Sequence, residues 1–112
     1  MTLDTRLATP SDAEACGRIM FQAFQAIARS HGFTPDFPSE AAAVGLAASL
    51  IANPAVYGVV AEFDGKVVGS NFLSEADPVR GVGPITVDPE LQGLGVGRRL
   101  MQAVIDRGEG TA

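Results

Sequence analysis

The residues best suited to chemistry stand near the C-terminal end of the chain, in the segment PITVDPELQGLGVGRRLMQAV. Glycines occupy every second position at Gly93, Gly95 and Gly97, and two arginines, Arg98 and Arg99, follow directly. Glycines let the backbone approach a ligand closely, and a helix N-terminus offers unpaired N–H groups with partial positive charge. The pattern therefore predicts an anion-binding turn, for which a phosphate or pyrophosphate is the natural ligand.

Two familiar phosphate-binding loops do not fit this segment. A P-loop ends in Gly-Lys-Ser or Gly-Lys-Thr, whereas Gly97 precedes two arginines. The dinucleotide fingerprint G-x-G-x-x-G needs its third glycine one position later, and a further strand after the helix. The glycines alone are also compatible with a turn that merely joins a strand to a helix, so a binding function needs further support.

The turn must be positioned by a strand before it and a helix after it. Residues 79–87 are mostly apolar and glycine-rich, but Pro84 interrupts them, which predicts an edge strand, a bulge or a local splay. A helix is expected over residues 95–107. Its spacing places four side chains inward: Leu100, Met101, Val104 and Ile105.

The rest of the chain predicts a strand, two helices and a hairpin. A strand over residues 5–9 precedes a helix that begins with the capping pair Ser11 and Glu14 and ends at Gly32. Its expected buried stripe is Cys16, Met20, Ala23 and Ile27.

A second helix begins at Ser39 and ends at Asn53-Pro54. Its expected buried face consists of Val44, Ala47, Ala48 and Ile51. Asp64-Gly65 then predicts a type I′ turn between strands over 56–63 and 66–73.

Motif and element order together resemble the GNAT acyltransferase superfamily. Motif A of that family is Gln or Arg, two residues, Gly, one residue, then Gly or Ala, and it is matched by Gln92, Gly95 and Gly97. Val87 and Pro89 match the Val-x-Pro that precedes it. The resemblance implies an α/β (α+β) fold of order β-α-α-β-β-β-α, in which helices flank a mixed, mostly antiparallel sheet. The C-terminal part of that fold is expected to be absent.

The resemblance also implies a site for acetyl-CoA. The pyrophosphate would lie against the turn and the start of the helix, and Arg98 is the first choice for a side-chain contact. The residues implied there are Gln92, Gly93, Leu94, Gly95, Val96, Gly97, Arg98 and Arg99. The pantetheine arm would pair with the strand before the turn, at Ile85, Thr86 and Val87. The Val87 N–H is then the candidate oxyanion donor.

In this family an amine attacks the thioester directly, so a base and an acid are needed. The strand over residues 79–87 holds no carboxylate, and the general base remains unassigned. Phe33 and Phe37, in the loop between the first two helices, are the candidates for an acceptor pocket. The candidates for a base are His31, Asp36, Glu62, Glu75 and Asp77.

Length and composition limit the possible domain organisation, partners and location of the protein. The chain has 112 residues, of which 46% are hydrophobic and 19% charged, so residues 1–112 are expected to form a single globular domain. The formal net charge of −5 argues against nucleic acid or an anionic membrane as a partner. With one cysteine and one histidine, an internal disulfide is excluded and no metal site is expected. No stretch has the form of a signal peptide or a membrane span, which predicts a cytoplasmic protein.

Two functions remain open. The first is an acyl-CoA-dependent N-acetyltransferase that acts on a small-molecule or peptide amine. The second is a catalytically inactive GNAT-like module that serves as a CoA-binding or protein-interaction unit. Because the family's diverging strand and Tyr-bearing helix are not in this sequence, the isolated chain is expected to be inactive. A homodimer, or pairing with a missing C-terminal segment, would complete the fold.

Overall fold

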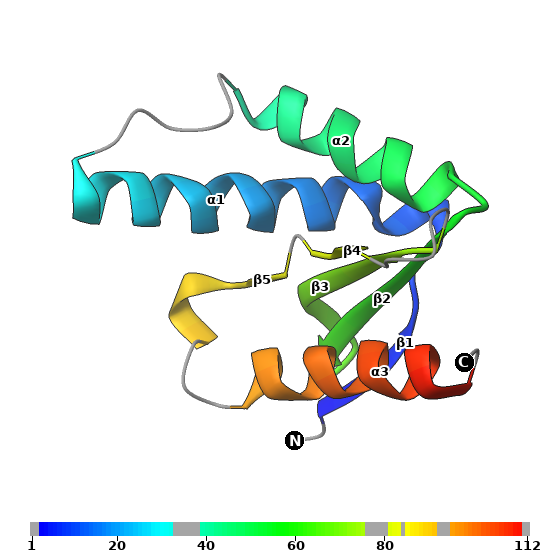
Figure 1. The fold of residues 1–112 in the computed structure, drawn as a ribbon. Coiled ribbons are helices and arrows are strands. Elements are labelled where there is room, and N and C mark those ends of the chain that lie inside the picture. The colour runs from blue at the N-terminus through cyan, green and yellow to red at the C-terminus, as the bar shows by residue number, and fades with distance from the viewer. Residues whose placement is uncertain (1–2, 33–38, 76–80, 84, 92–94, 111–112) are drawn as a thin grey trace.

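The computed structural model describes residues 3–32, 39–75, 81–83, 85–91 and 95–110. Helices cover both faces of an antiparallel sheet (Figure 1), which confirms the predicted α+β class and element order. The helices α1 and α2 pack on one face, and α3 packs on the other.

The sheet begins at β1 (Leu3–Leu7) and continues through β2 (Val56–Phe63) and β3 (Lys66–Ser74). The far edge of β3 pairs first with β4 (Gly81–Val82) and then with β5 (Thr86–Val87). All of these pairings are antiparallel. The first strand lies two residues earlier than predicted, at 3–7 instead of 5–9, because its register is set by pairing with β2.

The β2–β3 hairpin matches its prediction. Asp64 and Gly65 both have positive φ, at 53° and 83°, as a type I′ turn requires. β2 has the predicted bounds, and β3 extends one residue further, to Ser74.

The predicted strand over 79–87 is divided into β4 and β5. Leu73 pairs with Val82 and Ser70 pairs with Thr86, so three steps along β3 correspond to four steps along the other strand. The extra residue makes a β-bulge, and Gly83, with φ of 117°, stands within it. The interruption predicted for this strand is therefore confirmed.

Helix α1 (Ala13–His31) and helix α2 (Glu40–Ala52) pack tightly against each other. A Cβ atom at Gly17 would lie 2.3 Å from the Cα of Val44, so this close approach requires glycine. The core on this face joins both helices to the sheet and contains Cys16, Met20, Ala43, Ala47, Val60 and Phe72.

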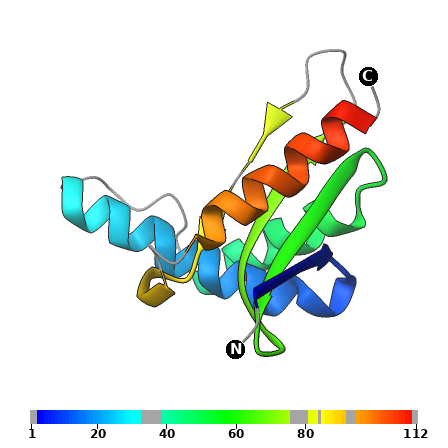
Figure 2. The same cartoon turned by 90° about the horizontal axis from the view of Figure 1, so that it is seen from below.

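Two predictions about these helix faces are wrong. Ile27 is 51% exposed because the C-terminal half of α1 projects past the sheet (Figures 1 and 2). On α2, Ala48 is exposed, while Ala43 and Ala47 are the fully buried residues. The contact at Gly17 turns this side of α2 toward α1.

The start of α1 also differs from its prediction, and α3 ends three residues later than predicted, at Gly110 instead of residue 107, whereas the bounds of α2 agree. The short 3-10 helix η1 (Pro10–Asp12) precedes α1, and the Thr9 N–H donates to Asp12 Oδ2 at 2.8 Å in place of a Ser11–Glu14 pair. Arg6 binds the Asp12 carboxylate and so fixes the helix start two residues earlier, at Thr9 instead of Ser11. Gly32 ends α1 with a φ of 70°, and Ser39 caps α2.

Helix α3 (Val96–Gly110) lies on the opposite face (Figure 2). Val96, Leu100 and Val104 are buried against β2 and β3. Met101 is half-buried and Ile105 is 44% exposed, so the predicted inward face is too wide. One i, i+4 stripe carries the packing of this helix.

Candidate functional site

The outer edge of β5 is open. The Asp88 N–H donates to the Val68 carbonyl at 2.8 Å, so Asp88 faces β3. Because successive peptide groups of a strand point to opposite sides, the N–H and C=O groups of Val87 and Ile85 point away from β3. In the described part of the chain no strand pairs with this edge, so these groups are free to bind a ligand.

A turn leads from this edge to the N-terminus of α3. It contains the 3-10 helix η2 (Pro89–Leu91), which begins where Asp88 Oδ1 accepts a hydrogen bond from the Glu90 N–H at 3.0 Å. Gly95 then has a φ of 82°, and its carbonyl accepts the Arg99 N–H at 3.1 Å. The N–H groups of residues 96–98 therefore form the first turn of α3, where a helix offers no internal partner.

Arginines follow at this helix end. Arg98 and Arg99 are both exposed, and neither makes an ion pair with a described residue. Their positive charge adds to that of the helix N-terminus. The arrangement can hold an anion by backbone and side chain together.

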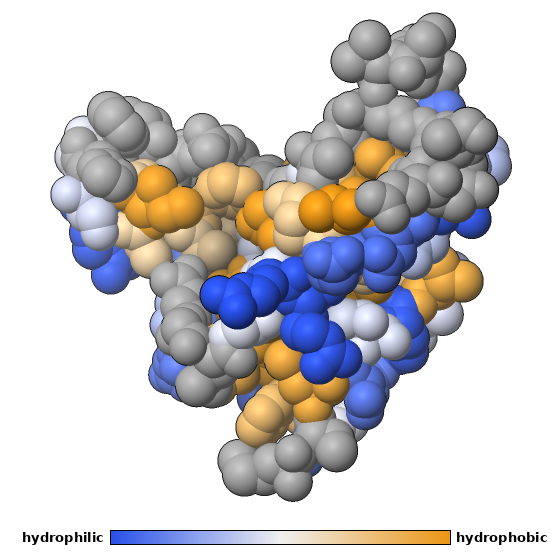
Figure 3. Space-filling model, turned by 60° about the horizontal axis from the view of Figure 1, so that its bottom comes forward, coloured by the Kyte–Doolittle hydropathy of each residue, from blue (hydrophilic) through white to orange (hydrophobic). Residues whose placement is uncertain are grey.

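A cavity of about 280 Å³ lies beside this turn, and its walls come from α1, β5, η2 and the start of α3. In Figure 3 a notch with apolar residues on both walls opens between the α1 side and the α3 side of the molecule. The residues that line the cavity are Ala23, Phe24, Ile27, Ile85, Thr86, Val87, Leu91, Val96 and Gly97.

The structure brings together many of the residues that the sequence suggested. Ile85, Thr86, Val87, Val96 and Gly97 line one cavity. The sequence missed its α1 wall, formed by Ala23, Phe24 and Ile27, and also Leu91. The three α1 residues are spaced i, i+1 and i+4, which places them on one side of a helix, but such spacing indicates a buried face as readily as a pocket wall. Gln92, Gly93, Leu94, Phe33 and Phe37 lie outside the described residues.

Two of the candidate bases are engaged away from the cavity. Glu62 binds Arg6 at the β1 edge. Glu75 accepts two hydrogen bonds from the Arg107 guanidinium, each of 3.2 Å, and this guanidinium lies 5.0 Å from the centre of the Tyr57 ring. Asp36 and Asp77 lie outside the described residues, and His31 is the last residue of α1.

A buried polar cluster lies behind β5. Thr86 is 3% exposed, and its hydroxyl lies 3.3 Å from the Ser70 hydroxyl. Cys16 is fully buried, and burial raises the pKa of its thiol to about 11. The Ser70–Thr86 pair ties β5 to β3. Thr86 and Cys16 are both buried, so neither is suited to act as a base at the open edge.

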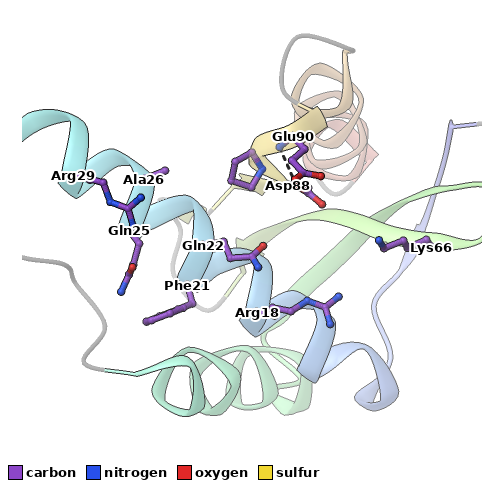
Figure 4. A pocket seen from close by; sticks show the side chains of 10 residues that line it. Arg18, Phe21, Gln22, Gln25, Ala26, Arg29, Lys66, Asp88 and Glu90 are labelled. Carbon is purple, nitrogen blue, oxygen red and sulfur yellow. Dashed lines mark hydrogen bonds between the residues drawn. The ribbon is translucent and has the colours of Figure 1, made fainter.

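A second, larger pocket of about 660 Å³ flanks η2 (Figure 4). Arg18, Gln22 and Arg29 of α1 form one wall, and Asp88 and Glu90 form the other. Its lining is mostly charged or polar, and it lacks the free strand edge and the helix N-terminus. The 280 Å³ cavity is therefore the better candidate for the site.

Comparison with known families decides the class of this protein. Residues 20–111 match the family model described as Acetyltransferase (GNAT) family. The chain belongs to this family. No match was found among the curated proteins.

Solved structures agree in fold. A GNAT family acetyltransferase from Brucella melitensis, in complex with acetyl-CoA, superposes with a TM-score of 0.75 at 24% identity; the match covers 99% of this chain and 71% of that one. A ribosomal-protein-alanine N-acetyltransferase from Brucella melitensis biovar Abortus 2308 superposes with a TM-score of 0.72 at 22% identity. This match covers 98% of this chain and 74% of that one.

The PaiA N-acetyltransferase from Thermoplasma acidophilum, in complex with coenzyme A, superposes with a TM-score of 0.77 at 12% identity. This match covers 99% of this chain and 74% of that one. At such identities the likeness establishes the GNAT fold. It extends over nearly the whole of this chain and about three-quarters of each of these proteins.

Two further findings concern the described residues alone. None of the helices there is long and apolar enough to cross a membrane. No group of three or more His, Cys, Asp or Glu side chains is placed in that part to hold a metal ion.

Proposed function

We propose that this GNAT domain binds acetyl-CoA along the open edge of β5 and serves an N-acetyltransferase that acetylates an amine. The observation that carries the proposal is a single continuous surface, in which the free strand edge, the apolar cavity and the first turn of α3 meet. A long ligand with an amide-bearing arm and a pyrophosphate matches these parts in that order.

Each part then has its own role. The free N–H and C=O groups of Ile85 and the free C=O group of Val87 pair with the pantetheine amides, as a further strand would. The Val87 N–H is the candidate donor to the thioester oxygen, where negative charge develops as the amine attacks. The apolar walls exclude water from the reacting carbonyl.

The pyrophosphate is assigned to the first turn of α3. Its N–H groups have no backbone partner among the residues that the structure describes, and Arg98 adds a charge-assisted contact. Gly97 is informative here, because a Cβ at this position would make only an ordinary 3.7 Å contact with Val87. Packing does not demand glycine at this place, whereas a ligand that lies against the backbone does.

The proposal is tested by titrating CoA into the wild type and into Gly97→Glu. The substitution fits the free protein but places a carboxylate where the pyrophosphate binds, so we expect at least about tenfold weaker binding, or about 1.4 kcal/mol. The matched control is Gly45→Glu, which adds the same charge to an exposed position of α2 with nothing within 4 Å. Absence of CoA binding by the wild type, or equal affinity in all three proteins, would refute the proposal.

One observation favours the second function, CoA binding without catalysis. The residues that line the described cavity include no titratable side chain. Amine-dependent thiol release distinguishes the two functions: we expect CoA to bind to the 112-residue chain but thiol release to stay at the protein-free rate. Turnover that Gly97→Glu abolishes would instead show that this chain catalyses the transfer by itself.

A further inference from the structure

Asn71 is a fully buried polar residue in the middle of β3, and its side chain faces α3. Its neighbours on that face are apolar: Leu73, Val96 and Leu100. A buried amide in such surroundings is costly unless its hydrogen bonds are made. Both ends of this amide are bonded, and the partners show what it does.

The first partner is a backbone N–H at the bulge. The Phe72 carbonyl accepts the Gly83 N–H at 2.7 Å, so Phe72 faces the strand that is divided into β4 and β5. The N–H of the same residue points to the same side, where the register shifts by one residue. Asn71 Oδ1 accepts this N–H at 2.9 Å. The side chain thus provides an acceptor at the point where the regular ladder is interrupted.

The second partner is helix α3. Asn71 Nδ2 donates to the Leu100 carbonyl at 3.3 Å. Leu100 is fully buried one turn after Val96, where the helix begins. One side chain therefore bonds both the strand next to the bulge and the second turn of α3.

A glycine allows this close arrangement. A Cβ at Gly69 would lie 2.8 Å from the Thr86 carbonyl oxygen and 3.0 Å from Leu100 Cδ1. Gly69 therefore lets β5 and α3 approach β3 closely. The next residue, Ser70, contacts the Thr86 hydroxyl on the other face of the sheet, and Asn71 donates a hydrogen bond to α3. Three consecutive residues thus fix two walls of the cavity against each other.

We propose that Asn71 is a positioning residue, which stabilises the bulge and sets the distance between the β5 edge and the first turn of α3. This inference rests on the proposed function, because those are the two surfaces assigned to the pantetheine arm and to the pyrophosphate. A ligand that spans both surfaces gains from their fixed spacing, whereas a ligand that touches one of them does not.

The first arm of the test needs no ligand. Amide hydrogen exchange is measured in the wild type, in Asn71→Leu and in Val60→Ala, which removes buried volume on the opposite, α1–α2 face. We expect the Phe72 amide of Asn71→Leu to exchange at least about tenfold faster relative to the β2 amides, with no such selective change in Val60→Ala. An unchanged Phe72 amide would overturn the inference whether or not CoA binds.

The second arm compares CoA with its parts. Pantetheine tests the strand edge alone and ADP tests the helix end alone. In Asn71→Leu we expect CoA affinity to fall at least about tenfold, while the affinities for pantetheine and ADP change less than about twofold. A merely structural defect would weaken all three in proportion to lost stability, as Val60→Ala reports. Equal losses for the three ligands would overturn the inference.

Asn71→Ser is the second variant, in case the leucine variant does not fold. It retains a hydroxyl but is too short to reach both partners, so the same selective loss of CoA affinity is expected. Failure of the wild type to bind CoA would count against the proposed function only. The exchange of the Phe72 amide would then still decide the role of Asn71 at the bulge.

Discussion

The sheet ends in β1 on one side and in β4 and β5 on the other, and the two edges are built differently. At the β1 edge, Arg6 bonds Asp12 through both terminal nitrogens, at 2.8 and 2.9 Å, and also bonds Glu62. The β1–β2 pairing is regular over five residues. At the other edge two strands of two residues each are separated by a bulge and bordered by an apolar cavity.

This contrast indicates that the β1 edge contributes mainly to stability and the β5 edge to ligand binding. Charged side chains protect the β1 edge, as exposed edges generally require. The β5 edge instead presents free backbone groups to a cavity, and its position depends on Gly69, Ser70 and Asn71 behind it. Changes at the first edge should therefore alter stability without altering ligand affinity, and changes behind the second should alter both.

The largest expected effect is that of Gly69→Ala. The added methyl group would meet the Thr86 carbonyl and Leu100, so β5 or α3 must move. Overpacking of this kind costs about 2–3 kcal/mol in the free energy of unfolding. Chemical denaturation gives that loss, and CoA titration should show weaker binding in the same variant.

Gly45→Ala is the control for this change. Gly45 lies within α2 with nothing within 4 Å, so alanine should raise stability by about 0.5–1 kcal/mol through helix propensity. Full CoA affinity in Gly69→Ala would contradict the view that β5 must lie close to β3 for binding.

The next effect concerns the β1 edge. The Arg6 guanidinium, assisted by the Thr9 N–H, lowers the pKa of Asp12 from 3.8 to about 2, although burial of the carboxyl group opposes this shift. A lowered pKa in the folded state contributes stability that is present above pH 3.8 and is lost as pH falls toward 2. The shift corresponds to about 2 kcal/mol.

Arg6→Met should therefore cost about 2 kcal/mol at neutral pH, because it leaves the buried Asp12 carboxylate without its cation. Its acid unfolding should begin at higher pH than that of the wild type. Unfolding curves across pH 2–7 test this, with Arg29→Met as a control at an exposed position of α1. CoA affinity at neutral pH should not change, and a parallel loss of affinity would break the distinction between the two edges.

The β1 edge also shows where local sequence was insufficient. Ser11 and Glu14 have the spacing of a capping box, but Thr9 and Asp12 form it because Arg6 binds Asp12. That choice depends on a cation from β1 and could not be read from the helix start. The hairpin at Asp64-Gly65 was predictable because two adjacent residues determine the turn by their own backbone preferences.

At the β5 edge, sequence predicted the parts but not their arrangement. The interrupted strand and the glycine turn follow from Pro84 and the glycine spacing, which are local signals. The α1 wall of the cavity depends on how far that helix projects past the sheet, and Asn71 gains its role from a register shift in another strand. Such long-range geometry leaves no local signal.

The smallest effect expected is that of Arg98→Ala, and it tests which part of the ligand lies at the helix end. Arg98 is exposed, so its charge-assisted contact with phosphate is worth about 1.4 kcal/mol, or about tenfold in CoA affinity. Pantetheine, which has no pyrophosphate, should bind the variant and the wild type alike. Arg18→Ala removes the same charge from α1, at a residue that lines the second pocket and not the 280 Å³ cavity, and it should leave both affinities unchanged.

The ionic strength of the titration adds a further criterion. A contact between an exposed guanidinium and phosphate is screened by salt, so the difference between wild type and Arg98→Ala should shrink as salt is raised. The effect of Gly97→Glu should shrink less, because its side chain also fills the space in front of the α3 amides. If Arg98→Ala weakened pantetheine as much as CoA, Arg98 would lie beside the pantetheine arm, and the pyrophosphate would have to be placed elsewhere on this edge.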